Sequence, residues 1–432
     1  MLDSLSVELV QEIILHLHSN QQKSLRVCKY LCDAIDPVAF RKLPMSTRRF
    51  SDEYLRTIPQ SAWSRHATVL AVEGNNKNDG FGADPAQREN LRRALSSLQK
   101  LTTITWLTYN YDPAWIGEEI AHFLNVHPLL HGLRLHMRPQ NFSEEILKSF
   151  LGLVHPNNLR DLDISSWWQT SPAIEDSITR LILHNPHIDT LRVSLSPYAS
   201  SAWRVLTQGV LPRLKHISTN VVTPQLLRYL ASFSGLESIA LSGFDADSEA
   251  REDEPSAATD LLASEFFTTS LPKHAQSITK LELSPSYEGT WCFGSEDAHK
   301  QVILAINSLE KLRHLSICIM SKDIPGVDTT SQTGCNGVKL LLDLACSHPC
   351  APFETLDIKV SDSCDLREAE CGNASDDHHD SYGRGIVNLV EAYPIRNRFH
   401  APKSVYAAIA SCVIKEGDGG PMYKVKSYWW ED

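Results

Sequence analysis

The sequence lacks any apolar run close to the roughly 20 residues that a helix needs to span a membrane. Its first residues also lack the basic stretch that precedes the apolar core of a secretory signal peptide. Glu8, Gln11 and Glu12 interrupt the apolar residues there at helical spacing. These absences exclude a membrane-spanning or secreted protein, and we expect the chain to reside in the cytoplasm or the nucleus.

Motifs of the common catalytic sites are also missing. The sequence has no Walker phosphate loop, no dinucleotide-binding glycine fingerprint, no HExxH metal motif and no GxSxG nucleophile elbow. Gly80 and Gly82 are closely spaced, but they lie in a polar segment and not between a strand and a helix. The sequence therefore predicts a protein that is not an enzyme and that binds no cofactor.

A metal site is the one chemical alternative that the residues raise. Several possible ligands gather late in the chain: Cys346, His348, Cys350, Cys364, Cys371, His378 and His379. Zinc needs about four converging thiolate or imidazole ligands. The first cysteines of this group instead end an apolar helical pattern, where free cysteine is an ordinary small hydrophobic residue. We expect the ten cysteines to be reduced thiols and the chain to hold no metal.

Negative charge predominates, with 52 acidic against 41 basic residues and a formal net charge of -11. An excess of this sign repels phosphate groups, so we expect binding neither to nucleic acid nor to a membrane surface. Residues 245–260 are acidic, polar and proline-containing, which is typical of a solvated loop.

What the sequence does contain is one short pattern that keeps returning: apolar, two other residues, apolar, one other residue, apolar. Its central apolar positions are Ile104, Leu133, Leu162, Leu191, Ile217, Ile239, Leu281, Leu315 and Leu356. The first four are separated by 29 residues three times in succession. Helix-period apolar faces lie between the strands, and each of the first three ends in a step such as His127-Pro128.

A repeat of one strand and one helix predicts a parallel sheet with helices on its outer side. The pattern and its period resemble leucine-rich repeats over residues 98–360. The resemblance implies an α/β solenoid whose inner face recognises a partner. We therefore expect residues 1–45 to be helical, 46–97 a linker with a first weak repeat, 98–360 the solenoid, and 361–432 a loop and C-terminal cap.

The sequence also supports predictions for several segments between and after the repeats. Residues 74–90 read as a polar linker, and residues 284–297 and 321–337 as loose insertions. In the C-terminal cap we expect a helix near Ile386, a second helix beginning at Pro402, and a strand over residues 422–430.

The N-terminal segment shows an apolar stripe at helical spacing, formed by Leu5, Leu9, Ile13 and Leu17. A second helical pattern follows from Leu25, and we expect Asp36-Pro37 to end it and to begin a third short helix. Three short helices cannot bury their apolar faces alone, so they need a partner or the following domain.

Leu5-Ser6-x-Glu8-Leu9 with Ile13 and Leu17, followed by Leu25-Arg26-Val27-Cys28-Lys29, resembles the F-box motif. That resemblance implies docking on the Skp adaptor of cullin ubiquitin ligases through Leu5, Leu9, Ile13, Leu17, Leu25, Val27 and Cys28. The family usually has Leu-Pro where this chain has Leu5-Ser6, and a leucine in the inter-helix loop where this chain has Gln21 and Gln22. Two alternatives stay open: a plain cap for the first repeat, or an unrelated helical module.

The leading functional hypothesis is a substrate-recognition subunit of a Skp–cullin–F-box ubiquitin ligase. Arg134, Asp163 and Arg192 lie between inward-facing strand positions, so their side chains should form a ladder on the open face of the sheet. Trp167 and Trp168 follow the third strand of the clear repeats and could anchor a protein substrate at the rim of that ladder. The alternative is a leucine-rich-repeat interaction scaffold with no role in ubiquitin transfer.

Overall fold

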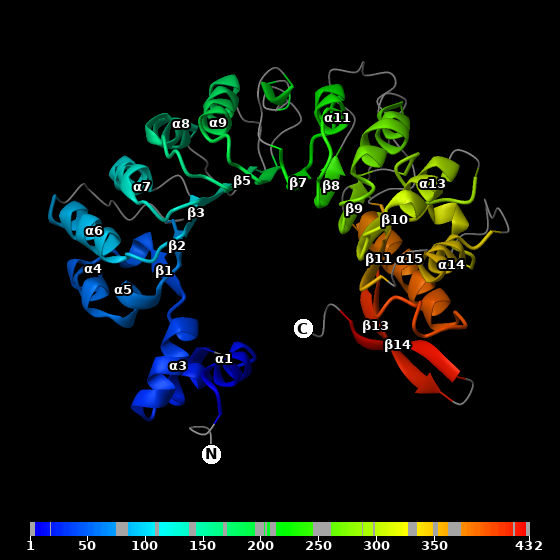
Figure 1. Ribbon diagram of the computed structural model, residues 1–432, viewed down its shortest axis with the longest axis horizontal. Coiled ribbons are helices and arrows are strands. Elements are labelled where there is room, and N and C mark those ends of the chain that lie inside the picture. Colours follow the sequence, from blue (N-terminus) through cyan, green and yellow to red (C-terminus); the bar gives the residue numbers. More distant parts are fainter. Residues whose placement is uncertain are drawn as a thin grey trace. The chain divides into compact units, whose positions relative to one another are not determined.

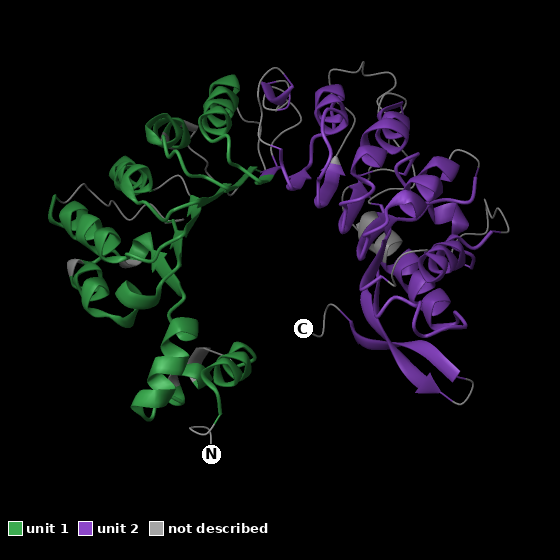
Figure 2. Cartoon of the chain, in the orientation of Figure 1, with its two compact units in different colours: residues 1–191 green, residues 192–432 purple. Residues whose placement is uncertain are grey.

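The computed structural model describes residues 5–17, 19–74, 85–108, 112–137, 144–166, 171–194, 203, 205–207, 213–244, 261–286, 288–296, 299–326, 335–348, 353–361, 373–417 and 420–428. The chain forms two compact units, Met1–Leu191 and Arg192–Asp432, which Figure 2 shows in different colours. Each unit is described by itself. None of the helices in these ranges is long and apolar enough to cross a membrane.

Unit 1 begins with short helices and continues with alternating strands and helices. Its helices are α1 (Val7–Leu15), α2 (Ser19–Ser24), α3 (Lys29–Ala39), α4 (Asp52–Thr57), α5 (Ala62–His66), α6 (Pro85–Ser97), α7 (Ala114–Val126), α8 (Glu144–Leu153) and α9 (Pro172–His184). Its strands are β1 (Lys42–Ser46), β2 (Val69–Glu73), β3 (Thr103–Thr108), β4 (Gly132–Met137), β5 (Asp161–Ser166) and the start of β6 (Thr190–Ser194).

Unit 2 continues the alternation and ends in a hairpin. Its strands are β7 (His216–Thr219), β8 (Ser238–Phe244), β9 (Lys280–Pro285), β10 (His314–Cys318), β11 (Thr355–Lys359), β12 (Ser404–Ala407), β13 (Ala410–Gly417) and β14 (Gly420–Tyr428). Its helices include α11 (Pro224–Ala231), α13 (Lys300–Ser308), α14 (Gly337–Ser347) and α15 (Asn373–Glu391).

The parallel register explains the repeat that the sequence shows. In unit 1 the central positions Ile104, Leu133 and Leu162 lie opposite one another. In unit 2 the same holds from Ile217 on β7 to Leu356 on β11. Each of the nine central positions is at most 1% exposed. Helices cover this buried face of the strands in both units (Figure 1). The fold is an α/β solenoid of the leucine-rich-repeat type, as expected.

The ladder of central positions extends beyond the clear repeats at both ends. Leu43 on β1 and Leu70 on β2 precede Ile104 in register, and Val405 on β12 follows Leu356. The first weak repeat expected within residues 46–97 is therefore present, with β2 as its strand, whereas β1 was not anticipated. The expected domain boundaries at residues 45, 97 and 360 stay predictions.

Several expectations about local structure were wrong. Residues 85–90 belong to α6 and not to a linker, because proline is well tolerated at the start of a helix. Pro37 does not break the second helical pattern, since α3 continues through it to Ala39. Pro402 begins no helix. The segment after it forms β12 and β13, which reverse direction at Ala408, where φ is 49°.

Residues 284–297 are not a loose insertion where the structure describes them. Trp291, Cys292 and Phe293 are fully buried, and Phe293 forms a parallel β-bridge with Ile319. The side chain of Glu288 accepts the backbone N–H of Ser321 at 2.8 Å. Burial raises the pKa of Glu288 to about 7, and this segment adds core to unit 2.

A buried histidine joins successive repeats of unit 2 at the ends of their helices. His274 Nδ1 accepts the backbone N–H of Leu236 at 3.3 Å, and Nε2 donates to the carbonyl of Leu230 at 3.0 Å. Loss of solvent lowers the pKa of His274 to about 4, because the charged imidazolium is disfavoured in the core. The ring therefore stays neutral in the folded chain near neutral pH.

Acid should destabilise unit 2 through this residue. Between pH 6.5 and pH 4 the unfolded chain binds a proton at His274 that the folded chain does not, so stability falls as the pH falls. At pH 4.5 we expect His274 to cost about 2 kcal/mol relative to pH 6.5. Urea unfolding of the wild type and of His274→Asn at both pH values measures the difference. Equal losses in the two proteins would contradict this role.

Candidate protein-interaction site

The N-terminal helices have a small hydrophobic core of their own. Val10 and Ile14 of α1 pack against Leu31, Ala34 and Ile35 of α3. All five side chains are buried. The spacing of four between Val10 and Ile14 places both on one side of α1. The residues that a partner could contact must therefore come from the other side of that helix.

Other side chains of α1 are apolar and open to solvent. Leu9 is 54% exposed and Ile13, one turn further along the same side, is 43% exposed. Val7 and Leu15 are also exposed, but they lie on a different side of the helix. Val27, between α2 and α3, is 77% exposed. We call the side of α1 that exposes Leu9 and Ile13 the α1 face.

The residues expected to bind an adaptor divide into two groups in the structure. Leu9, Ile13, Val27 and Cys28 are exposed. Leu5 and Leu25 are partly buried against the helical core, and Leu17 is half-buried. The sequence analysis missed Val7 and Leu15, because neither belongs to the stripe of every fourth residue that identified the helix.

Ser6 and Gln22, the polar departures from the F-box pattern, both make contacts at the ends of α1. Ser6 Oγ accepts the N–H of Leu9 at 3.4 Å, so Ser6 caps the start of the helix. Gln22 Nε2 donates to the carbonyls of Ile14 and Leu17, each at 2.9 Å. Carbonyls at a helix end have no partner within the helix, and Gln22 satisfies two of them.

The connection between α2 and α3 is fixed by one ion pair. Arg26 Nε lies 2.7 Å from Asp36 Oδ1, and Arg26 Nη2 donates to Asp36 Oδ2 at 3.1 Å. The guanidinium also lies 5.0 Å from the ring centroid of Phe40. Because Arg26 is held in this way, the neighbouring Val27 is presented to solvent at a defined position.

The open face of the sheet carries the residues expected to bind a substrate. Arg134 lies opposite Thr105 on one side and Asp163 on the other, which is the expected register. Arg134 Nη2 forms its ion pair with Asp161 Oδ2 at 2.8 Å. Arg192 is on β6, at the first residue of unit 2. Trp167 and Trp168 lie outside the described residues.

The late cysteines and histidines are only partly described. Burial raises the pKa of the Cys346 thiol, and His348 Nε2 lies 3.3 Å from the carbonyl of Ile306 at the end of α13. Within the described ranges no group of three histidine, cysteine or acidic side chains could hold a metal ion. Cys350, Cys364 and Cys371 lie outside those ranges, so the absence of a metal stays a prediction.

No protein-family model matches the sequence, and comparison with curated proteins finds no match. Among solved structures, a chain of the Rad7–Elc1 complex from yeast is similar, with a TM-score of 0.43 and 12% identity. That match covers 86% of this chain and 92% of the other. A protein from Bacteroides fragilis matches with a TM-score of 0.31 and 10% identity, over 61% of this chain and 62% of that one. The description of the fold therefore rests on the register and burial given above.

Proposed function

We propose that this chain is the substrate-recognition subunit of a Skp–cullin–F-box ubiquitin ligase in the cytoplasm or nucleus. Helices α1 to α3 dock a Skp-type adaptor, which links the chain to a cullin scaffold. The solenoid holds a protein substrate, and partner subunits transfer ubiquitin. The chain itself contributes no catalytic residue and no cofactor, only the position of the substrate.

The observation that carries this proposal is the exposure of Leu9, Ile13 and Val27 on helices whose core is made by other residues. Apolar side chains in water cost about 25 cal/mol for each Å² that a partner would bury. A cluster of them on a small helical region, rimmed by polar residues, marks a surface for protein binding. The resemblance of the same residues to the F-box supports a Skp-type adaptor as that partner.

A leucine-rich-repeat scaffold with no role in ubiquitin transfer is the second candidate, and Gln22 favours it. The family pattern has a leucine in the loop between its helices, whereas Gln22 lies in α2 and its polar side chain is bonded to α1. This position therefore offers an adaptor no apolar side chain. On this alternative the N-terminal helices cap the first repeat, and the solenoid binds its partner alone.

Affinity purification separates the two functions. The full chain is compared with a chain that begins at Arg41, which spares β1 and so leaves the strand ladder intact. We expect a Skp-type adaptor and a cullin with the full chain only, and other partners with both. If the full chain retains no such adaptor at matched expression, the ubiquitin-ligase role is wrong and the scaffold remains.

For the substrate we propose the open face of the sheet, with Arg134, Asp163 and Arg192 as polar contacts and Trp167 or Trp168 as the anchor. Reversing Arg134 and Arg192 to Glu together with Trp168→Ala should weaken binding about tenfold or more, as for hot-spot residues. The measurement uses partners retained by the chain that begins at Arg41.

The matched control reverses charges on the helical side of the solenoid. Lys148 on α8 and Lys339 on α14 are both exposed, and Lys148→Glu with Lys339→Glu should leave binding of the same partners unchanged. Unchanged binding in the open-face variant, at a melting temperature equal to the parent, would place the substrate elsewhere.

A further inference from the structure

Phe399 is the most exposed large hydrophobic side chain in the described residues, at 86%. It lies in the turn between α15 and β12, within five successive exposed residues, 396–400. A phenylalanine held in water at a turn contributes nothing to the core of unit 2. The exposed ring is therefore a candidate contact for another protein surface.

Hydrogen bonds and buried neighbours hold the turn in shape. Asn397 Oδ1 accepts the N–H of Phe399 at 3.0 Å, and the Asn397 carbonyl accepts the N–H groups of His400 and Ala401, each at 3.2 Å. After the turn, the carbonyl of Pro402 accepts the hydroxyl of the buried Tyr423 at 2.9 Å. Phe399 is thus presented outward by a preorganised turn, so little order must be gained on binding.

The surroundings of Phe399 are basic in an acidic chain. Arg396, Arg398, His400 and Lys403 are all exposed, and Arg398 Nη1 lies 2.8 Å from Glu416 Oε1. The chain as a whole carries a net charge of -11. The turn is therefore a local basic surface with an aromatic centre, and its complement is an apolar surface edged by carboxylates.

The α1 face has that complementary chemistry. Leu9 and Ile13 are exposed one turn apart, and the exposed carboxylates of Glu8 and Glu12 lie beside them. Glu12 Oε1 lies 3.8 Å from Nε2 of the exposed His16. Two other exposed leucines differ: Leu153 and Leu183, near the ends of α8 and α9, are followed by histidine and asparagine and have no carboxylate next to them in sequence.

We propose that the chain self-associates, with the Phe399 turn of one copy docking on the α1 face of a second copy. Phe399 packs between Leu9 and Ile13, while Arg396 and Lys403 face Glu8 and Glu12. The two surfaces differ, so the contact is head-to-tail, and each copy keeps one free surface of each kind. The docked turn also covers the side chains proposed to bind the adaptor, so self-association and adaptor docking exclude each other.

Sedimentation or light scattering of the purified full chain tests this directly. We expect the average mass to rise above the monomer value of 48.4 kDa between about 10 µM and about 1 mM, the range of weak protein contacts. Phe399→Asp and Ile13→Glu should each stay monomeric. Added salt should lower the average mass of the wild type, because it screens the charged rim.

Mixing the two variants gives the sharpest result. Phe399→Asp keeps a working α1 face, and Ile13→Glu keeps a working Phe399 turn, so an equimolar mixture should form a dimer that cannot grow. The controls are Leu153→Glu, which alters an exposed leucine of unit 1, and Leu304→Asp, which alters one of unit 2. Both controls should associate like the wild type.

The proposal is overturned by a wild type that stays monomeric throughout, or by a mixture of the two variants that forms no dimer. Association that is lost in Leu153→Glu would also overturn it, since another surface would then be responsible. If Phe399→Asp folds poorly, Arg396→Glu with Lys403→Glu replaces it and should lower association. Phe399→Asp leaves the α1 face intact and should still bind a Skp-type adaptor, so failure here is distinguishable from failure of the ligase role.

Discussion

Replacing Glu119 by alanine is expected to lower the free energy of unfolding of unit 1 by about 2 kcal/mol, because it removes a buried carboxylate that accepts hydrogen bonds from two arginine side chains. Glu119 lies on α7, and its side chain is only 2% exposed. Its carboxylate accepts from Arg88 Nε at 2.6 Å and from Arg92 Nε and Nη2 at 3.0 and 2.9 Å. The two guanidinium groups hold the pKa of Glu119 below its usual value against the opposing effect of burial.

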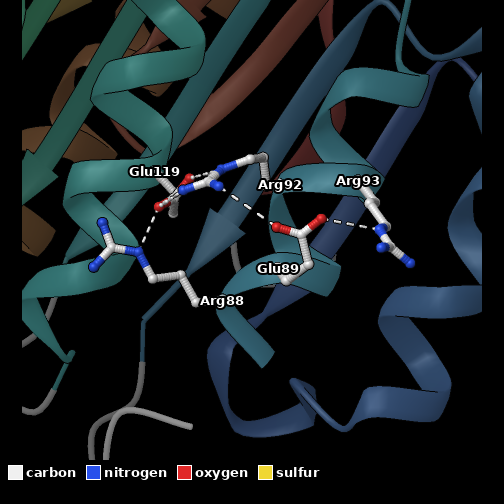
Figure 3. Close-up of polar contacts among 5 residues, drawn as sticks. All are labelled: Arg88, Glu89, Arg92, Arg93 and Glu119. Carbon is white, nitrogen blue, oxygen red and sulfur yellow. Dashed lines mark hydrogen bonds and ion pairs between the residues drawn. The ribbon is translucent and has the colours of Figure 1, made fainter. Parts of the chain in front are cut away.

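The hydrogen bonds to Glu119 contribute to the stability of α6 because this helix buries few apolar side chains. Figure 3 shows how Arg88 and Arg92 of α6 reach the carboxylate of Glu119 on the neighbouring helix. Leu91, Ala94 and Leu95 are the buried hydrophobic residues of α6. The network therefore fastens a largely polar helix to the next repeat, and losing it should loosen α6 first.

Urea unfolding followed by tryptophan fluorescence measures this loss. Glu119→Gln keeps the volume and one acceptor, so its loss should be smaller than that of the alanine variant. Glu89→Ala is the matched control: Glu89 bonds Arg93 and Arg92 in the same network but is 46% exposed, and we expect a loss below about 1 kcal/mol. Equal losses at Glu89 and Glu119 would show that burial of the carboxylate is not what stabilises α6.

The repeats were predictable because a large aliphatic residue recurs at the same position of each strand and fills the same part of the core. Ile104, Leu133 and Leu162 recur at an exact interval, since each fills the same place under the next strand. Strand type, parallel pairing and the side covered by helices all follow from that interval. Over β12, the turn after it and β13, the apolar residues Val405, Ile409 and Val413 fit a helical period equally well, so the sequence alone did not separate helix from strand.

Elements held by polar contacts were harder to predict. The segment before α6 reads as a linker because it is rich in glycine, asparagine and aspartate, and the partner of Arg88 and Arg92 lies some 30 residues later in sequence. The sequence pattern showed that α1 is a helix, but it did not show which side of the helix is buried. Val10 and Ile14 lie outside the stripe of every fourth residue that identified the helix, yet they form the core and leave Leu9 and Ile13 exposed.

The other large expected effect follows from that orientation. Ile13→Glu places a carboxylate at the centre of the proposed adaptor interface, where it would be desolvated without a partner at a cost of several kcal/mol. Because Ile13 is 43% exposed and lies outside the helical core, the variant should fold and melt like the wild type. Leu153→Glu is a close control, since Leu153 is also 43% exposed and lies at the end of a helix of unit 1.

Binding of the purified full chain to a purified Skp-type adaptor tests the central claim most directly. Titration calorimetry with the wild type, Ile13→Glu and Leu153→Glu gives the three dissociation constants, at chain concentrations where the wild type is monomeric. We expect Leu153→Glu to bind like the wild type and Ile13→Glu to bind about 100-fold more weakly or not at all. A wild type that does not bind the adaptor, or an Ile13→Glu variant that binds as tightly as the wild type, would contradict the proposed docking of α1.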